Sequence, residues 1–382
     1  TYISQRYELG MAMFLLGGLY AQTRSWEGDE RKWLNIALAC CVVGMGCKEV
    51  MVTAPVVFIL YDWCFAEGPF VIVVRRRARA YVALLLTWGV FAAIWASSVC
   101  QALLREGTVV SRFGRWEYLL TQMKVLPHYL WIEVFPRTLC FDHDWELVRG
   151  ILEVIPHMAV VVTFVTVILV GLIRRRRWAY LGAWWGIILL PTSSLFPLAD
   201  PVVEHRLYLP LAAITTAAAI LLARGYRWLM EHKWAGDSSN VWLRGLFLIP
   251  LVLISLLFRE AVKRNRVFSD ELVLWGDVLD KQPWNLRARV GMGKAMLDRG
   301  MIEAAEKRFR EVLSMIPTDK LDADRRLATQ YALAHNNLGV IEWKRGNTET
   351  ACRHFGEAVS VAPGYDNARR NLRTCRRKQD HP

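Results

Sequence analysis

Apolar residues dominate roughly the first two thirds of the chain, in runs that charged residues separate. Runs of this kind suit the hydrocarbon core of a bilayer, which is about 30 Å thick. About eight membrane spans are predicted, near residues 9–22, 34–47, 50–63, 80–100, 151–173, 178–198, 207–223 and 241–258. Lys48 and Glu49 interrupt the second and third runs, so a re-entrant or broken helix pair is the alternative there.

The distribution of Lys and Arg predicts how these spans are oriented. Basic residues concentrate in the loops 64–79, 174–177 and 224–240, which the positive-inside rule assigns to the cytoplasmic side. The polar segments expected on the opposite, extracytoplasmic side are residues 1–6, Lys48–Glu49, 101–150, 199–206 and everything after 259. Nearly every polar motif except the basic loops is therefore expected on one outer face.

After Phe258 the chain becomes more polar and contains an internal repeat. The set Gly293, Gly300, Ala305, Phe309 and Pro317 recurs with identical spacing as Gly339, Gly346, Ala351, Phe355 and Pro363. These spacings are those of tetratricopeptide repeats, in which small residues let two helices cross closely and an aromatic residue fills the groove. The extra residues 318–329 are expected to lengthen a connection or a helix.

Two further segments extend this array. A helix capped at Ser269-Asp-Glu, with Trp275 at the aromatic position, is expected to form the second half of another repeat. Residues 367–378 predict a basic helix that caps the array. The predicted fold is all-α, with a polytopic helical membrane domain over 1–258 and a tetratricopeptide α-solenoid over 259–382.

The first helix of each repeat lines the concave face of such arrays, where peptides bind. Polar or adaptable residues on these helices are therefore predicted to bind a protein or peptide partner. They are Arg289, Met292, His335 and Asn336.

Net charge and cysteine content exclude several classes of function. The net charge of +13 suggests nucleic-acid binding, but the basic runs Arg75–Arg77 and Arg174–Arg177 adjoin apolar segments and are topology signals. No zinc-type cysteine spacing or nucleic-acid-binding motif is present, so nucleic acid is not an expected partner. The eight cysteines show no spacing typical of a secreted disulfide framework. Motifs for nucleotide binding, hydrolase catalysis, zinc proteolysis and haem attachment are absent.

One acidic motif lies in the predicted outer segment 101–150. Asp142 and Asp144 flank His143, so this motif could hold a divalent cation or supply an acid/base pair. The alternative is a solvated turn with aromatic neighbours at the membrane interface. A divalent cation is the only cofactor that the sequence suggests.

A second group of charged residues lies in the stretch 191–210, between two apolar runs. Arg206 offers a planar fork for phosphate oxygens, and Glu204 or His205 could carry a proton. The alternative is a solvated loop between two spans. At the other outer positions, Lys48 could bind a lipid phosphate or neutralise Glu49. Arg6 could bind phosphate or extend its charge to the interface.

Several segments together resemble a known family. They are TYISQRYE at the start, Tyr61-Asp62-Trp63, CFDHDW, and PTSSLFPLADPVVEHRLYLPLA, followed by the C-terminal repeats. This order resembles bacterial relatives of the transmembrane-and-tetratricopeptide-repeat O-mannosyltransferases, in the GT-C glycosyltransferase class. The resemblance implies a GT-C-like enzyme of the bacterial inner membrane that takes a sugar from a polyprenyl-phosphate donor. In that class the acidic catalytic motif lies in the first outer loop, which would precede Thr1, so the N-terminal part is expected to be missing.

The predicted function is therefore sugar transfer to an extracytoplasmic acceptor, usually a protein hydroxyl, with membrane lipid as a second partner. Donor-phosphate binding is assigned to Arg206, His205, Lys48 and Arg6. Catalytic or metal-binding support is assigned to Asp142, Asp144, Glu204 and Glu49. The alternative is a non-catalytic membrane scaffold whose repeats recruit proteins. A transporter is a third reading, less favoured because the membrane half shows no internal repeat.

Overall fold

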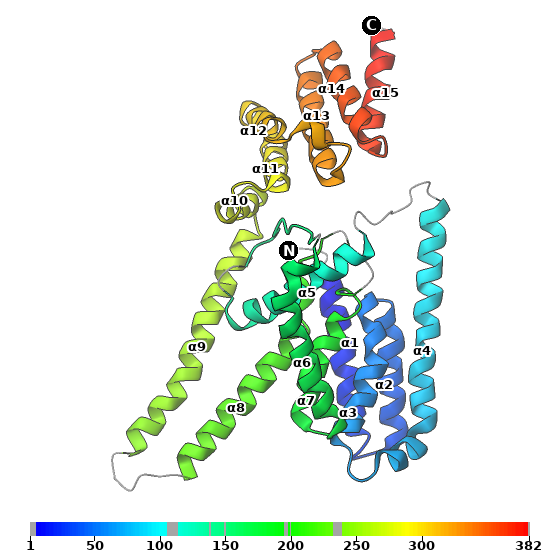
Figure 1. The fold of residues 1–382 in the computed structure, drawn as a ribbon, viewed down its shortest axis with the longest axis vertical. Coiled ribbons are helices and arrows are strands. Elements are labelled where there is room, and N and C mark those ends of the chain that lie inside the picture. Colours follow the sequence, from blue (N-terminus) through cyan, green and yellow to red (C-terminus); the bar gives the residue numbers. More distant parts are fainter. Residues whose placement is uncertain are drawn as a thin grey trace. The chain divides into compact units, whose positions relative to one another are not determined.

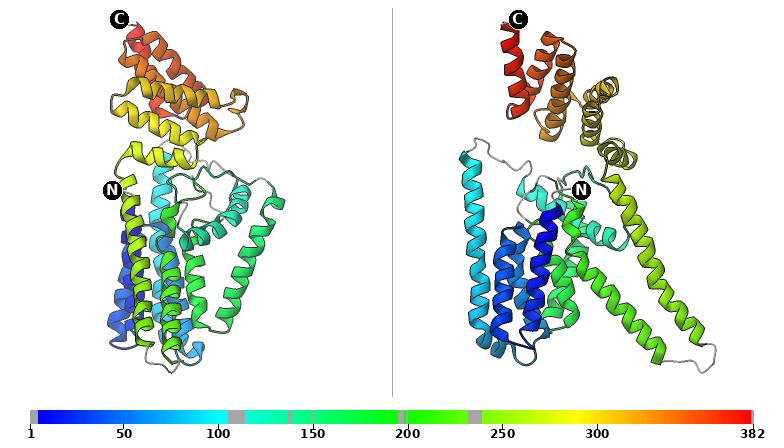
Figure 2. Two further views of the ribbon diagram at one scale, coloured as in Figure 1. Left: turned by 90° about the vertical axis from the view of Figure 1, so that its left-hand side faces the viewer. Right: turned by 180° about the vertical axis from the view of Figure 1, so that it is seen from behind.

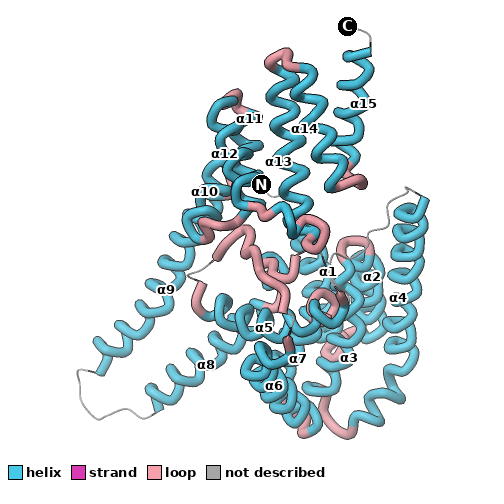
Figure 3. Tube along the Cα trace, turned by 45° about the horizontal axis from the view of Figure 1, so that its top comes forward, coloured by secondary structure: helices cyan, strands magenta, loops and turns pink. Residues whose placement is uncertain are grey.

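The computed structural model describes residues 5–104, 114–136, 139–148, 150–194, 198, 200–231 and 239–380. Within these ranges every regular element is a helix (Figures 1 and 3). The chain forms two compact units. The bundle unit comprises residues 2–139 and 145–245, and the C-terminal unit comprises residues 140–144 and 246–382.

The bundle unit is built from long apolar helices. Its elements are α1 (Gln5–Arg24), α2 (Glu30–Met45), η1 (Glu49–Thr53), α3 (Ala54–Phe65), α4 (Phe70–Leu104), α5 (Arg115–Val134), η2 (Ile151–Val154), α6 (Ile155–Ile173), α7 (Arg177–Leu189), η3 (Glu204–Leu207), α8 (Leu211–Glu231) and the start of α9 (Ser239–Val267). α1 packs against α2, and α4 packs against α2 and α3 (Figure 2). α7 contacts α3, α6 and α8 and so joins the two halves of the bundle.

Each of the eight predicted apolar runs contains a helix, but several helices begin or end elsewhere than predicted. α4 already begins at Phe70, so the basic residues 75–79 of the predicted loop 64–79 are helical, and α8 continues to Glu231 within the predicted loop 224–240. α7 ends at Leu189 instead of continuing to 198, because Pro191 has no backbone N–H with which to extend the helical hydrogen bonds. α9 continues to Val267 and passes the predicted boundary at 258 without a break. Two segments, Phe70–Ser97 and Ile151–Ile173, are long and apolar enough to cross a membrane. For the other runs, membrane crossing stays a prediction.

α6 shows the surface expected of a helix that does not face water. Val160, Val162, Val165, Val167 and Leu169 are each about half exposed. A contiguous apolar surface of this kind marks contact with lipid or with another protein.

One end of the bundle contains a buried ionic network that sequence reasoning did not anticipate. The Asp62 carboxylate on α3 is fully buried and accepts four hydrogen bonds. The donors are Gln22 Nε2 at 2.7 Å, Trp26 Nε1 at 2.9 Å, Arg77 Nη1 at 3.0 Å and Tyr81 Oη at 2.7 Å. A buried carboxylate is stable only when it is paired and hydrogen-bonded in this way.

Arg77 is the cation of this network. Its guanidinium is 1% exposed and also donates to Ser25 Oγ at 2.8 Å and Glu30 Oε1 at 3.0 Å. The guanidinium carbon lies 3.6 Å from the centre of the Trp26 ring, in a cation–π contact. The network thus ties together α1, α2, α3 and α4.

The C-terminal unit is a series of helix pairs. Its elements are the rest of α9, α10 (Glu271–Lys281), α11 (Leu286–Asp298), α12 (Ile302–Met315), η4 (Thr318–Lys320), α13 (Arg325–Lys344), α14 (Thr348–Val361) and α15 (Asp366–Asp380). A Cβ atom on Gly293 would lie 2.8 Å from the Phe309 ring, and one on Gly339 would lie 2.6 Å from the Phe355 ring. The small and aromatic positions of the repeat therefore meet as the sequence pattern requires.

Details of the helix boundaries refine the sequence-based expectations. The cap of α10 is Asp270, whose Oδ1 accepts from the backbone of Leu272 and Val273, and not the Ser269 side chain. The extra residues 318–329 form the short helix η4 and the first turn of a lengthened α13. Gly300 and Gly346 have φ of +76° and +84°, which explains why glycine ends the first helix of each pair.

A disulfide between Cys352 and Cys375 joins α14 to α15. The cysteine spacing, which does not resemble a secreted disulfide framework, gave no indication of this bond. The two cysteines are 23 residues apart, and only the packing of α15 against α14 brings them together. No motif spacing signals such a pair.

Candidate functional site

Ionisable side chains from three elements of the bundle unit meet at the start of α1. Glu8 on α1 is 4% exposed, and its carboxylate forms an ion pair with Lys48 Nζ, just before η1. His205 Nε2 on η3 lies 3.8 Å from Glu8 Oε1. We call Glu8, Lys48, His205 and Arg206 the charged cluster. Its members come from segments that lie 40 residues apart in the case of Glu8 and Lys48, and far more for His205 and Arg206.

The break between α2 and α3 positions Lys48. Gly46 ends α2, and Lys48 has extended backbone with φ −160° and ψ 150° before η1 begins. The ammonium group of Lys48 therefore projects from a short connection between two helices toward Glu8. The predicted interruption at this place is present.

Arg206 and α5 shape the loop that carries His205. The Arg206 guanidinium donates to the carbonyl oxygens of Asp200 at 2.9 Å and Pro201 at 3.2 Å. From α5, Gln122 Nε2 donates to the Pro201 carbonyl at 3.2 Å, and Tyr129 Oη accepts from Val203 N at 2.8 Å. The loop is therefore anchored to α5. Residues 195–197 and 199 of the predicted stretch lie outside the described residues.

The environment of His205 favours its neutral form. Burial, together with the Lys48 and Arg206 cations, lowers the pKa of His205 to about 4. At neutral pH the imidazole therefore adds no positive charge. It can still donate one hydrogen bond and accept another.

The remaining bundle residues predicted for the site lie around this cluster. Arg6 is exposed, two residues before Glu8 on α1. Glu49 is exposed at the start of η1, and Glu204 is half-buried at the start of η3. Glu8 was not among the predicted site residues. Its only signal was an acidic side chain at the edge of an apolar run, and its importance comes from its burial beside Lys48.

Asp142 and Asp144 belong to the C-terminal unit, where arginines bind both of them. Asp142 Oδ2 lies 3.4 Å from Arg287 Nε, and Asp144 Oδ1 lies 2.5 Å from Arg326 Nη1. A divalent cation would have to compete with these guanidinium groups. Within the part of the chain that the structure describes, no group of three or more His, Cys, Asp or Glu residues is arranged to hold a metal.

Aromatic packing explains why the segment 140–144 lies against the helix pairs. The centre of the Phe141 ring lies 5.4 Å from the centre of the Trp275 ring and 6.0 Å from that of the Phe268 ring, in edge-to-face contacts. Gln282 Nε2 also donates to the His143 carbonyl at 2.8 Å. The motif that suggested a metal turn is thus anchored to α10 by its aromatic residue.

The four residues predicted to bind a partner differ in accessibility. Arg289 is half-buried and donates to the Pro283 carbonyl at 2.6 Å, and Met292 is half-buried beside Gly276. His335 is 9% exposed and its Nδ1 lies 2.9 Å from His354 Nδ1. Asn336 is 5% exposed and accepts a hydrogen bond from Asn371. Burial leaves little of His335 or Asn336 for a bound peptide to contact.

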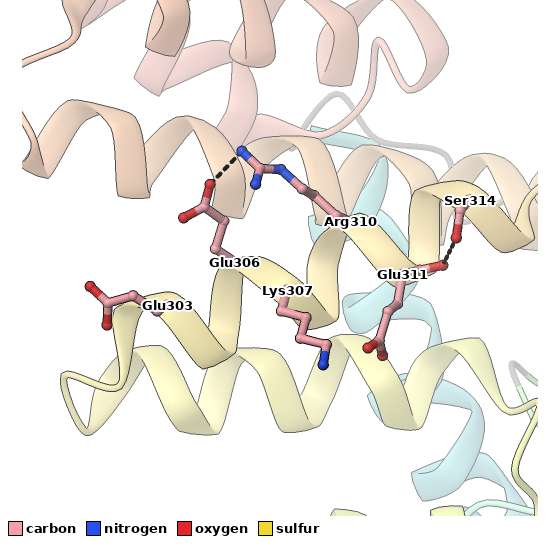
Figure 4. Close-up of a pocket in the computed structure, with 6 residues that line it drawn as sticks. All are labelled: Glu303, Glu306, Lys307, Arg310, Glu311 and Ser314. Carbon is pink, nitrogen blue, oxygen red and sulfur yellow. Dashed lines mark hydrogen bonds and ion pairs between the residues drawn. The ribbon is translucent and has the colours of Figure 1, made fainter.

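A shallow pocket on α12 carries charges of both signs (Figure 4). It is lined by Glu303, Glu306, Lys307, Arg310, Glu311 and Ser314. Glu306 points toward Arg310 and pairs with it at 2.5 Å, and Arg345 Nη2 also donates to Glu306 at 2.6 Å. Because opposite charges neutralise each other here, the pocket favours neither anions nor cations.

A second pocket, between α5, α6 and α7, is almost entirely apolar. Its lining includes Met123 and Leu130 of α5, Phe164 of α6 and Trp185 of α7. Trp185 Nε1 donates to Glu133 Oε2 at 2.6 Å, at the last turn of α5. Among the described residues, Glu133 Oε1 is buried without a hydrogen-bond partner. Burial raises the pKa of Glu133 to about 7.

Glu133→Gln should change how stability depends on pH. The unfolded carboxyl ionises near 4.5 but the folded one near 7, so wild-type stability should fall as pH rises from about 4.5 to 7. Gln cannot ionise and keeps an oxygen for Trp185. At pH 8 the free energy of unfolding of the variant should exceed that of wild type by about 1–2 kcal/mol, a value that allows for solvent screening of the partly exposed carboxyl. At pH 4.5 the two proteins should be equally stable. Apparent melting temperatures across this range test it, with Glu146→Gln at an exposed position as control. A difference that does not vary with pH would contradict it.

Comparison with known proteins adds one relative. No protein-family model matches the chain. A protein O-mannosyl-transferase of Caenorhabditis elegans is 26% identical over 324 residues, which cover 83% of this chain. The matched region spans only 43% of that protein's length. Over most of its length, the chain is therefore similar to part of a protein O-mannosyl-transferase.

Proposed function

We propose that this protein is a GT-C-like membrane glycosyltransferase that transfers a sugar, such as mannose, from a polyprenyl-phosphate donor to a protein hydroxyl. One observation carries the proposal: Lys48 and His205, which were predicted together as phosphate-binding residues, both lie beside the buried carboxylate of Glu8. The similarity to a protein O-mannosyl-transferase supports the same chemistry. The apolar pocket between α5, α6 and α7 suits a lipid chain.

In the reaction, the acceptor oxygen would bond to the anomeric carbon of the sugar while the bond from that carbon to the phosphate oxygen breaks. The phosphate leaves with an additional negative charge, which Lys48 and Arg206 would stabilise. The neutral His205 would donate a hydrogen bond to it, and Arg6 would add charge at the exposed edge. The acceptor proton would pass to a carboxylate, for which Glu49 and Glu204 are the candidates. Asp142 and Asp144, which bind arginines, are less suited to this role.

The proposal includes a polytopic membrane domain and an extracytoplasmic tetratricopeptide array that recognises the acceptor or a partner. The close contacts of Gly293 with Phe309 and of Gly339 with Phe355 support the repeat assignment. The Cys352–Cys375 disulfide supports the extracytoplasmic location, because structural disulfides persist in oxidising compartments.

Binding of a polyprenyl-phosphate sugar to the purified full-length protein tests the proposal. Arg206→Ala should weaken binding about 10- to 150-fold, since a charged hydrogen bond contributes about 1.5–3 kcal/mol. Arg206→Lys keeps the charge but not the fork, so it should recover only part of the affinity.

Arg206 also donates hydrogen bonds to the carbonyls of Asp200 and Pro201, so Arg206→Ala could weaken binding by disturbing the loop. A control must separate this effect from the loss of the positive charge. Gln122→Met removes another tie to Pro201 without removing a charge, and should weaken binding much less than Arg206→Ala. Equal affinities in wild type, Arg206→Ala and Arg206→Lys would contradict donor binding at this cluster. The non-catalytic membrane scaffold would then be favoured.

A further inference from the structure

α15 carries the densest basic surface in the C-terminal unit. Within its 15 residues, six exposed side chains are cationic: Arg369, Arg370, Arg373, Arg376, Arg377 and Lys378. At 100° per residue, the five arginines fall within about 120° of the helix circumference, on a stripe about 12 Å long. We call these five residues the arginine stripe.

The opposite face of α15 packs against the preceding helices. Ala368 and Cys375 are fully buried, and Leu372 packs with Cys352 and Phe355 of α14. Cys375 is also bonded to Cys352. The helix is therefore fixed on the last helix pair, with the arginine stripe turned outward.

Few carboxylates neutralise the positive charge of the arginine stripe. Arg369 pairs with Asp366, and Arg370 donates to Asn367 Oδ1 at 2.5 Å. Among the side chains that the structure describes, which in this helix end at residue 379, Arg373, Arg376 and Arg377 form no ion pair, although Arg373 still interacts electrostatically with Asp366. Arg373 lies four residues from both Arg369 and Arg377, a spacing at which like charges destabilise a helix. Packing and the disulfide must hold this helix against its own repulsion.

We propose that the arginine stripe of α15 binds an acidic polypeptide segment. All five cations are arginines, whose planar guanidinium groups bind carboxylates through two parallel hydrogen bonds. An anionic membrane surface fits less well, because helices that bind membranes insert apolar side chains. The exposed positions of α15 are all polar or charged, since its apolar residues already pack on α14.

The test uses the full-length protein in phosphatidylcholine nanodiscs and a fluorescein-labelled glutamate-rich peptide. Wild type should bind this peptide and not its glutamine counterpart, and the affinity should fall as salt rises. The triple variant Arg369→Gln, Arg373→Gln and Arg377→Gln should bind about tenfold more weakly or worse, at about two- to fivefold for each exposed pair lost.

The matched control removes the same charge elsewhere in the C-terminal unit. Lys294, Lys307 and Lys344 are exposed lysines on three other helices, and their replacement by Gln should weaken binding less than about threefold. Replacing the three stripe arginines by Lys should give intermediate affinity, because the charge stays and the fork is lost. A gel that shows the Cys352–Cys375 disulfide intact establishes that α15 stays docked in each variant.

Two results would overturn the proposal. If the triple Arg→Gln variant and the triple Lys→Gln control lost the same affinity for the peptide, net charge alone would attract it. Stripe-dependent binding to vesicles of phosphatidylcholine and phosphatidylglycerol, without binding to the glutamate-rich peptide, would identify the stripe as a lipid-binding surface instead.

Discussion

Arg77→Ala should destabilise the bundle unit by about 3–5 kcal/mol, the cost of leaving a buried charge without its partner. The variant keeps Asp62 fully buried while it removes the guanidinium that neutralises it. The hydrogen bonds to Ser25 and Glu30 and the contact with Trp26 are lost as well. The apparent melting temperature of the detergent-purified protein, measured by tryptophan fluorescence, should fall sharply.

The neighbouring Arg76 is the matched control. It lies one position earlier on α4 and also binds Glu30, but its side chain is 60% exposed. Arg76→Ala should therefore cost less than about 1 kcal/mol. The double variant Asp62→Leu, Arg77→Met removes both charges, so it should be less destabilised than Arg77→Ala. Equal effects of Arg76→Ala and Arg77→Ala would show that the network contributes little.

Cys352→Ser should increase the rate at which trypsin cleaves within α15 about 100-fold. The disulfide closes a loop with a sequence separation of 23, which corresponds to about 3 kcal/mol in the chain-entropy model. Without it, α15 opens more often and exposes its arginines to the protease. Cleavage of wild type and variant, followed by gel electrophoresis over time, gives the ratio.

Reduced wild type should behave like Cys352→Ser, whereas Cys47→Ser, at a free and half-buried thiol in the bundle, should match oxidised wild type. The native protein should also resist labelling by a maleimide at Cys352 and Cys375. Rapid labelling of both thiols in protein purified without reductant would mean that the disulfide does not form. It would also remove the support that the disulfide lends to an extracytoplasmic location.

Periodic features of the sequence predicted much of the helical architecture. Apolar runs marked where helices form. In an apolar environment the backbone N–H and C=O groups must be hydrogen-bonded within the protein, and a helix pairs them within one segment. The repeat of Gly293 and Phe309 in Gly339 and Phe355 predicted the close helix pairs, since a missing Cβ and a large ring are complementary in shape. Lys48 and Glu49 marked the break between α2 and α3 because two charges are costly inside an apolar helix.

Tertiary structure alone decided which of the charged residues act together. Nothing near Arg77 in the sequence distinguishes it from Arg76, yet one is buried against Asp62 and the other is exposed. Asp142 and Asp144 have the spacing of a metal motif, but Phe141 packs on α10 and arginines take both carboxylates. Local pattern indicates which segments form helices. Burial and pairing depend on which residues distant in sequence come into contact, as Glu8, Lys48 and His205 do.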